Sequence, residues 1–170
     1  MDHPPPFHIG DSVVHPAHGL GRVVRLAKKS FFGQEAGLYY EVAIQQGTVW
    51  VPVALREAPG LRPVTAQGDL ARYRRLLKGP PVSLDQDHRK RHIELVDRLR
   101  QGSFQILCEV VRDLAARGWI KPLGESDAAS LRRAREKLCA EWAASKGVSI
   151  SAAAQEVESL LLESRQTHHA

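Results

Sequence analysis

The sequence predicts an α+β protein in two parts: a small antiparallel β barrel of the SH3 or Tudor type over residues 1–65 and an all-helical bundle over residues 66–170. Three observations support this division. Short β-branched and aromatic runs, separated by glycine and proline, fill the first part. Apolar residues recur at helical spacing through the second part. Between them, the segment Pro59-Gly60-Leu61-Arg62-Pro63 has the turn-rich composition of a linker.

Four strands are expected, over residues 12–15, 20–26, 38–44 and 48–53. Pro16 ends the first strand because proline has no N–H to donate to a ladder. Short strands at this spacing favour a small barrel, whose exposed edge is open to strand addition by a partner. Tyr39 and Tyr40 are adjacent in a strand, so one of them should face the core. Trp50 fits either a barrel core or an interface anchor, and the sequence leaves both open.

Five helices are expected, one short amphipathic helix over residues 67–78 and four more between residues 84 and 165. Gly79-Pro80-Pro81 ends the first helix. The expected caps of the later helices are Ser103, then Ser126 or Asp127, then Ser149 or Ser151. Short connections between these helices predict a compact bundle.

The basic surplus of the chain begins where the helices begin. The net charge is +5, and residues 66–102 contain nine Lys or Arg against five acidic residues, compared with six against five in residues 1–65. The densest stretch is His88-Arg89-Lys90-Arg91. Such a cluster can neutralise phosphates of DNA or RNA and release their counterions. It can equally be a solvated helical face, and charge alone does not decide between the two.

The sequence favours a binding protein over an enzyme. The histidine pairs His15/His18 and His88/His92 lack a third metal ligand, and no serine or cysteine nucleophile accompanies them, so neither metal nor cofactor is expected. Cys108 and Cys139 are expected to be buried thiols. No apolar run is long enough for a membrane span, so we expect a cytoplasmic protein. We also expect a monomer.

The barrel segment resembles a known family. The pattern Gly10-Asp11-x-Val13-Val14-x-Pro16-x-His18-Gly19-x-Gly21, followed by Val51-Pro52 in the fourth strand, is similar to the RNA-polymerase-interacting domain of the CarD/CdnL family, which transcription-repair coupling factors share. The resemblance implies binding to the β subunit of bacterial RNA polymerase. The predicted polymerase-binding residues are Lys29, Val51 and Pro52, which follow the family, and Trp50, an anchor candidate at a position where the family has arginine.

The helical segment resembles the DNA-binding domain of the same family. The similar stretches are Gly102-Ser103-Phe104, Glu109 to Leu114, and Leu131-x-x-Ala134-Arg135-x-x-Leu138. The resemblance implies contact with promoter DNA at the upstream edge of the transcription bubble, where a tryptophan of the family wedges into the minor groove. The implied DNA-binding residues here are His88, at the position of that tryptophan, with Lys90, Arg91 and Arg133.

These implications define two candidate functions. In the first, the protein is a nucleoid-associated transcription regulator that tethers polymerase and stabilises promoter DNA. Its wedge into the minor groove is weakened, because His88 replaces the tryptophan of the family. In the second, it is a polymerase-binding adaptor without functional DNA contact. Salt-dependent DNA affinity distinguishes them, because only the first should lose DNA affinity steeply as salt rises.

Overall fold

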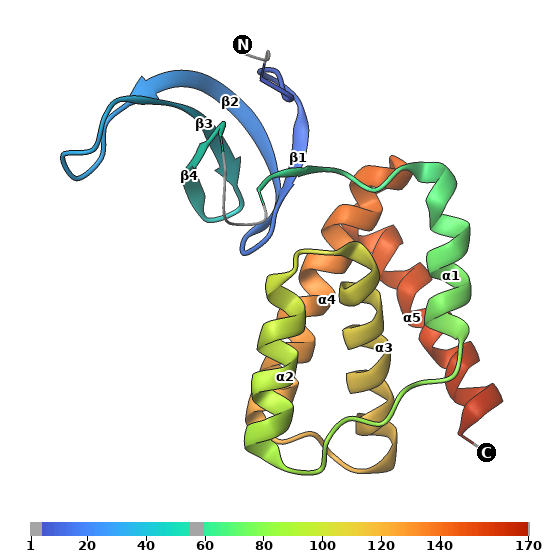
Figure 1. Ribbon diagram of the computed structural model, residues 1–170. Coiled ribbons are helices and arrows are strands. Elements are labelled where there is room, and N and C mark those ends of the chain that lie inside the picture. The colour runs from blue at the N-terminus through green and yellow to red at the C-terminus, as the bar shows by residue number, and fades with distance from the viewer. Residues whose placement is uncertain (1–4, 55–59, 170) are drawn as a thin grey trace. The chain divides into compact units, whose positions relative to one another are not determined.

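The chain folds into two compact units, divided between Val64 and Thr65. The computed structural model describes residues 5–54 and 60–169, and Figure 1 traces the chain through both units. The first unit is a sheet and the second is a bundle of helices, and each has its own hydrophobic core. The predicted α+β class is therefore confirmed.

The first unit is one antiparallel sheet of five described strands. They are β1 (Ser12–His15), β2 (Gly19–Lys29), β3 (Gly37–Ile44), β4 (Gly47–Pro52) and β5 (Arg62–Pro63), in the order β4-β3-β2-β1-β5. The long strand β2 curves strongly (Figure 1), and the register of its pairing with β3 shifts between Val23 and Arg25. A bulge of this kind bends a strand and raises its twist. The result is the barrel-like domain that the strand pattern predicts.

Strand β5 was not predicted. Arg62 and Pro63 belong to the segment interpreted as a linker, yet they pair with Val14 and Val13 of β1. Two residues are too few to show a period, and proline is tolerated here because β5 lies at the edge of the sheet. Pro59, from the same predicted linker, lies outside the described residues.

The core of the sheet unit comes from alternate residues of its strands. Tyr40 is buried and Tyr39 lies on the opposite face, which confirms that one of the pair belongs to the core. The buried residues of this core are Val13, Val23, Tyr40, Val42 and Val51. Gly21 is needed for close packing, because a Cβ there would lie 2.7 Å from Val42 Cγ1 and 2.9 Å from the carbonyl oxygen of Ala43.

The turn after β1 uses its two histidines structurally. Nδ1 of His15 accepts hydrogen bonds from the backbone N–H groups of Ala17 (3.0 Å) and His18 (3.2 Å). The two imidazole rings lie against each other with centroids 4.8 Å apart. Within the described residues, no three histidine, cysteine or acidic side chains come together as a metal site.

The second unit contains five α-helices. They are α1 (Leu70–Lys78), α2 (His88–Arg100), α3 (Phe104–Ile120), α4 (Glu125–Lys146) and α5 (Ile150–His168), with a 3₁₀ turn (Gln67–Asp69) before α1. The side chains of Ser103 and Ser149 cap α3 and α5 by accepting the N–H groups of Ile106 and Ala152. The predicted cap of α4 is wrong. That helix starts two or three residues earlier, after Gly124, and Asp127 is buried in it.

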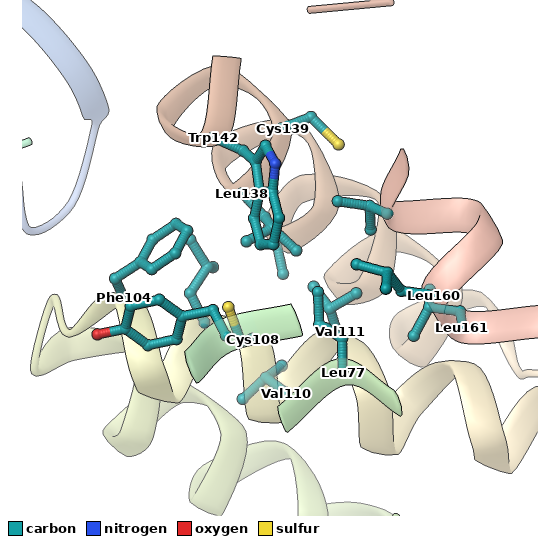
Figure 2. Close-up of a cluster of buried hydrophobic side chains, with 14 of the residues drawn as sticks. Leu77, Phe104, Cys108, Val110, Val111, Leu138, Cys139, Trp142, Leu160 and Leu161 are labelled. Carbon is teal, nitrogen blue, oxygen red and sulfur yellow. The ribbon is translucent and has the colours of Figure 1, made fainter. Parts of the chain in front are cut away.

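The helical core is built around Trp142 (Figure 2). Its indole is fully buried, and with Leu138 of α4 it faces Cys108 and Val111 of α3. The remaining walls come from α1 and α5. Truncating a buried tryptophan of this kind to alanine costs about 3–5 kcal/mol. Both cysteines are buried, and burial, with help from nearby carboxylates, raises the pKa of the Cys108 thiol well above its usual value.

A polar cluster around Glu156 ties α5 to α1 and α4. Its carboxylate accepts hydrogen bonds from Arg74 Nε (2.6 Å), Lys146 Nζ (2.7 Å) and Trp142 Nε1 (3.2 Å). Burial acts to raise the pKa of Glu156, but these donors outweigh it and lower the pKa to about 2. The carboxylate is therefore ionised at neutral pH and stabilises the packing of three helices.

Candidate functional site

Trp50 lies on the outer face of the sheet beneath two cations. Lys29 Nζ lies 4.8 Å and Arg25 Cζ 5.3 Å from the centroid of its ring. The strand register explains this cluster, since Arg25, Glu41 and Trp50 are cross-strand neighbours on β2, β3 and β4. Arg25 Nε also donates to Glu41 Oε2 at 2.7 Å. Trp50 is thus partly exposed and is not a core residue, which decides between its two predicted roles.

Strand β4 lies at an edge of the sheet, next to β3 alone among the described strands. Pro52 suits this position because an edge strand needs no donor on its outer side. Val51 is different: its side chain is only 6% exposed and packs in the core. Val51 was predicted to contact polymerase, but its side chain is buried here. Its backbone faces Tyr40 of β3, in the same phase as Val53, whose N–H donates to Leu38 of β3, so the outward-facing backbone groups of this edge belong to its neighbours in β4.

The start of α2 presents His88 to solvent. Asp87 caps the helix by accepting the N–H of Lys90 at 2.9 Å, and this fixes the backbone at His88. His88 and His92 stack one turn apart, with parallel rings and centroids 6.5 Å apart. His92 Nδ1 in turn lies 3.5 Å from Ser126 Oγ of α4. The two imidazoles thus lie on the side of α2 that faces α4.

Arg91, one of the predicted DNA-binding residues, is buried in an ion pair. Its side chain is buried, 5% exposed, and its Nη2 lies 3.0 Å from Asp127 Oδ2. Nη1 donates to the carbonyl oxygens of Asp85 (2.8 Å) and Gln86 (3.1 Å). A guanidinium used in this way neutralises Asp127 and holds the segment ahead of His88. It does not present its charge to a phosphate.

The other two predicted DNA contacts are Lys90 of α2 and Arg133 of α4, and their side chains lie apart. Lys90 is exposed, but residues two apart on a helix do not share a face, so it points away from the side that carries His92. Arg133 is exposed on α4, two turns along the same face as Ser126, and therefore lies on the His92 side. The structure does not bring Lys90 and Arg133 into one patch.

Two further features change the electrostatic picture. Arg133 has a cationic neighbour, since burial, together with the charge of Arg133, lowers the pKa of Lys137. The start of α2 is less basic than its sequence indicates, because its exposed cations Arg89 and Lys90 stand among three exposed carboxylates, those of Asp85, Asp87 and Glu94. Exposed basic side chains of this unit therefore lie on α4, at Arg132 and Arg133, as well as on α2.

Some of the residues in these sites could have been found from sequence and others could not. Arg25 was missed, although the period of two along a strand places it on the same face as Lys29. Asp127 had no local signal, because its partner Arg91 is 36 residues away. Asp113 is a similar case: it is buried in α3, and its Oδ1 accepts the N–H of Val82, 31 residues earlier, at 3.0 Å.

Comparison with known proteins gives the same two-part division. Residues 7–65 match the family described as CarD-like/TRCF RID domain, and residues 73–158 match the one described as CarD, C-terminal domain. The chain belongs to the CarD family. It is 30% identical over 144 residues to YdeB of Bacillus subtilis (strain 168), which is named as a candidate transcription factor, and the match covers 84% of this chain and 94% of YdeB.

Membership of the CarD family indicates a role in transcription regulation. The RID match spans all five described strands, and the C-terminal match includes His88 and the Arg91–Asp127 pair. None of the described helices combines the length and the apolar character that crossing a membrane requires.

Proposed function

We propose that this protein is a non-enzymatic transcription regulator that binds the RNA polymerase β subunit through its sheet unit. The observation that carries this proposal is the cluster of Trp50, Lys29 and Arg25 beside the edge strand β4, within the CarD-like/TRCF RID match. A partly exposed tryptophan flanked by cations has the composition of an interface anchor, and the open edge offers backbone groups to a partner strand. Such a protein acts in the cytoplasm at the nucleoid, where polymerase works.

The helical unit is proposed to contact promoter DNA near the upstream edge of the transcription bubble. Support comes from the match to the CarD C-terminal domain and from the exposed position of His88, Lys90 and Arg133. His88 stands where the family resemblance implies a tryptophan wedge. An imidazole is smaller than an indole, so it should separate base steps poorly while still reaching a phosphate or a narrow groove. The proposed effect on open promoter complexes is therefore weak.

The polymerase proposal is tested by measuring the affinity of the full chain for purified RNA polymerase. Lys29→Glu removes the cation above Trp50 and reverses its charge, so it should weaken binding, as should Trp50→Ala. Lys121→Glu is the matched control, because it makes the same charge change at an exposed position of the helical unit. Equal affinities of Lys29→Glu and Lys121→Glu would contradict the assignment to the sheet.

The second candidate, a polymerase-binding adaptor without DNA contact, is favoured by one observation. The burial of Arg91 and the three carboxylates around the start of α2 leave little basic surplus there. Open-complex lifetimes and the salt dependence of promoter binding separate the candidates. A regulator that contacts DNA should lose affinity steeply with added salt and change the lifetime, whereas an adaptor should do neither.

A further inference from the structure

Phe32 is fully exposed at the tip of the β2–β3 hairpin in a strained backbone conformation. Its ring does not belong to the hydrophobic core of the sheet, and its φ of 53° lies in the left-handed region. A bulky side chain rarely adopts positive φ, and holding it there costs on the order of 1–3 kcal/mol. Exposing a phenylalanine also forfeits the stabilisation that burial would bring. Folding alone gives no reason for a phenylalanine at this position.

The loop that carries Phe32 is held by its own contacts. Phe31 packs edge-on against Tyr39, with ring centroids 5.0 Å apart. The N–H of Gln34 donates to the carbonyl oxygen of Phe31 at 3.1 Å, and the hydroxyl of Ser30 donates to the carbonyl oxygen of Gln34. These contacts fix the residues on both sides of Phe32 and leave its ring pointing outward. The backbone that carries the ring is thus ordered before any partner arrives, which lowers the part of the entropic cost of binding that comes from ordering the loop.

The surroundings of Phe32 identify the kind of partner. Residues 22–40 contain four basic residues and one acidic residue. Lys29 lies three residues before Phe32 and covers Trp50 on the outer face, and Phe31 extends that face through Tyr39. The apolar tip is therefore continuous with a cationic aromatic surface. The complementary surface is an apolar pocket with an acidic rim.

We infer that Phe32 is an anchor that inserts into an apolar, acid-rimmed pocket on the protein partner of the sheet unit. This inference rests on the proposed function, in which that partner is RNA polymerase. A preformed aromatic tip beside Trp50 makes a two-point contact, with the strand edge and Trp50 setting register and Phe32 filling the pocket. Nucleic-acid stacking and self-association are the competing uses of an exposed phenylalanine.

The test compares the affinities of full-length variants for purified RNA polymerase. Phe32→Asn should weaken binding about 30-fold, the factor expected for loss of a hot-spot side chain. Because asparagine tolerates positive φ, the same variant should unfold at an equal or higher urea concentration than the native protein. A residue needed only for folding would show the reverse pattern. The control is Ile9→Asn, which removes another exposed apolar side chain from the same unit and should leave affinity unchanged.

The outcomes separate this inference from the function on which it rests. If the native protein binds polymerase and Lys29→Glu weakens binding but Phe32→Asn does not, the anchor is refuted and the proposed function stands. If the native protein does not bind polymerase, both fail. A Phe32→Asn variant that binds polymerase normally but loses DNA affinity would assign the tip to nucleic acid instead. Self-association of the native protein that Phe32→Asn abolishes would assign the tip to a second copy.

Discussion

The pair Arg91–Asp127 provides the sharpest test of the structure, because it reassigns a residue predicted to bind DNA. Both side chains are 5% exposed. Nε of Arg91 donates to both carboxylate oxygens of Asp127, at 3.2 and 3.0 Å, and its Nη1 holds two backbone carbonyls ahead of α2. Removing either partner leaves the other buried without its main counter-charge. We therefore expect Arg91→Ala and Asp127→Ala to lower the free energy of unfolding strongly.

The expected sizes follow from what each truncation leaves behind. Loss of one partner of a buried ion pair costs about 3–5 kcal/mol. After Arg91→Ala, Asp127 still has Arg117, whose Nε lies 3.5 Å from Asp127 Oδ2, so the cost should fall near about 3 kcal/mol. After Asp127→Ala, two guanidinium groups remain together without a carboxylate, so the cost should approach about 5 kcal/mol. The order of the two effects is as diagnostic as their size.

Urea unfolding monitored by circular dichroism measures these costs. For a denaturant dependence of about 1–3 kcal/mol per molar urea, Arg91→Ala should move the midpoint down by roughly 1–3 M. Arg89→Ala is the control, since Arg89 is an exposed cation on the same helix and should matter by less than about 0.5 kcal/mol. A cost below about 1 kcal/mol for Arg91→Ala, or a smaller cost for Asp127→Ala than for Arg91→Ala, would refute this reasoning.

Three further predictions concern DNA, the wedge position and pH. Replacing Lys90 and Arg133 with alanine should flatten the plot of log affinity against log salt by up to about two units; a further flattening from Arg91→Ala in folded protein would contradict its burial. His88→Trp should lengthen the open-complex lifetime, whereas His88→Ala should change it little. The gain from His88→Trp should vanish when Arg91→Met is added. If His88→Ala instead abolishes the effect of the native protein on this lifetime, histidine is itself an adequate wedge. Because the pKa of Glu156 is lowered to about 2, its contribution is present above its ordinary value of 4.5 and is lost as pH falls toward 2. Glu156→Gln should remove about 2–3 kcal/mol of unfolding free energy at pH 6 and less at pH 2, and an equal loss at both pH values would count against the cluster.

Local chemistry explains the parts of the fold that sequence predicts well. A serine before an apolar run can accept the N–H groups that every helix start leaves unpaired, and Ser103 and Ser149 do so. The period of two along a strand separates Tyr39 from Tyr40 without knowledge of any partner strand. Such signals involve residues a few positions apart. Strands β1 to β4 and the five α-helices follow from them.

Features that depend on distant partners could not be predicted in this way. The two-residue strand β5 exists only because β1 is beside it, about 50 residues earlier in the chain. Arg91 and Val51 were assigned to surfaces by charge and by motif, and the burial of both depends on neighbours from other elements. The start of α4 also depends on a distant partner, since Asp127 lies inside the helix, where its carboxylate accepts a hydrogen bond from Arg91, and does not cap the helix.

Helix α2 shows why local charge overestimates a DNA-binding surface. Only Arg91 and Leu95 are buried from this helix, and the apolar Ile93 is 61% exposed. Ion pairs therefore supply much of its attachment, Arg91 to Asp127 of α4 and Arg98 to Glu109 of α3 at 2.9 Å. Both cations are therefore paired with carboxylates inside the bundle. A buried ion pair requires good geometry to offset its desolvation cost. Because Arg91 also holds the carbonyls of Asp85 and Gln86, the pair that fixes α2 fixes the backbone that presents His88. In the proposed promoter contact, Arg91 would act by fixing the position of residue 88, so we expect a tryptophan placed there to act only while the pair is intact.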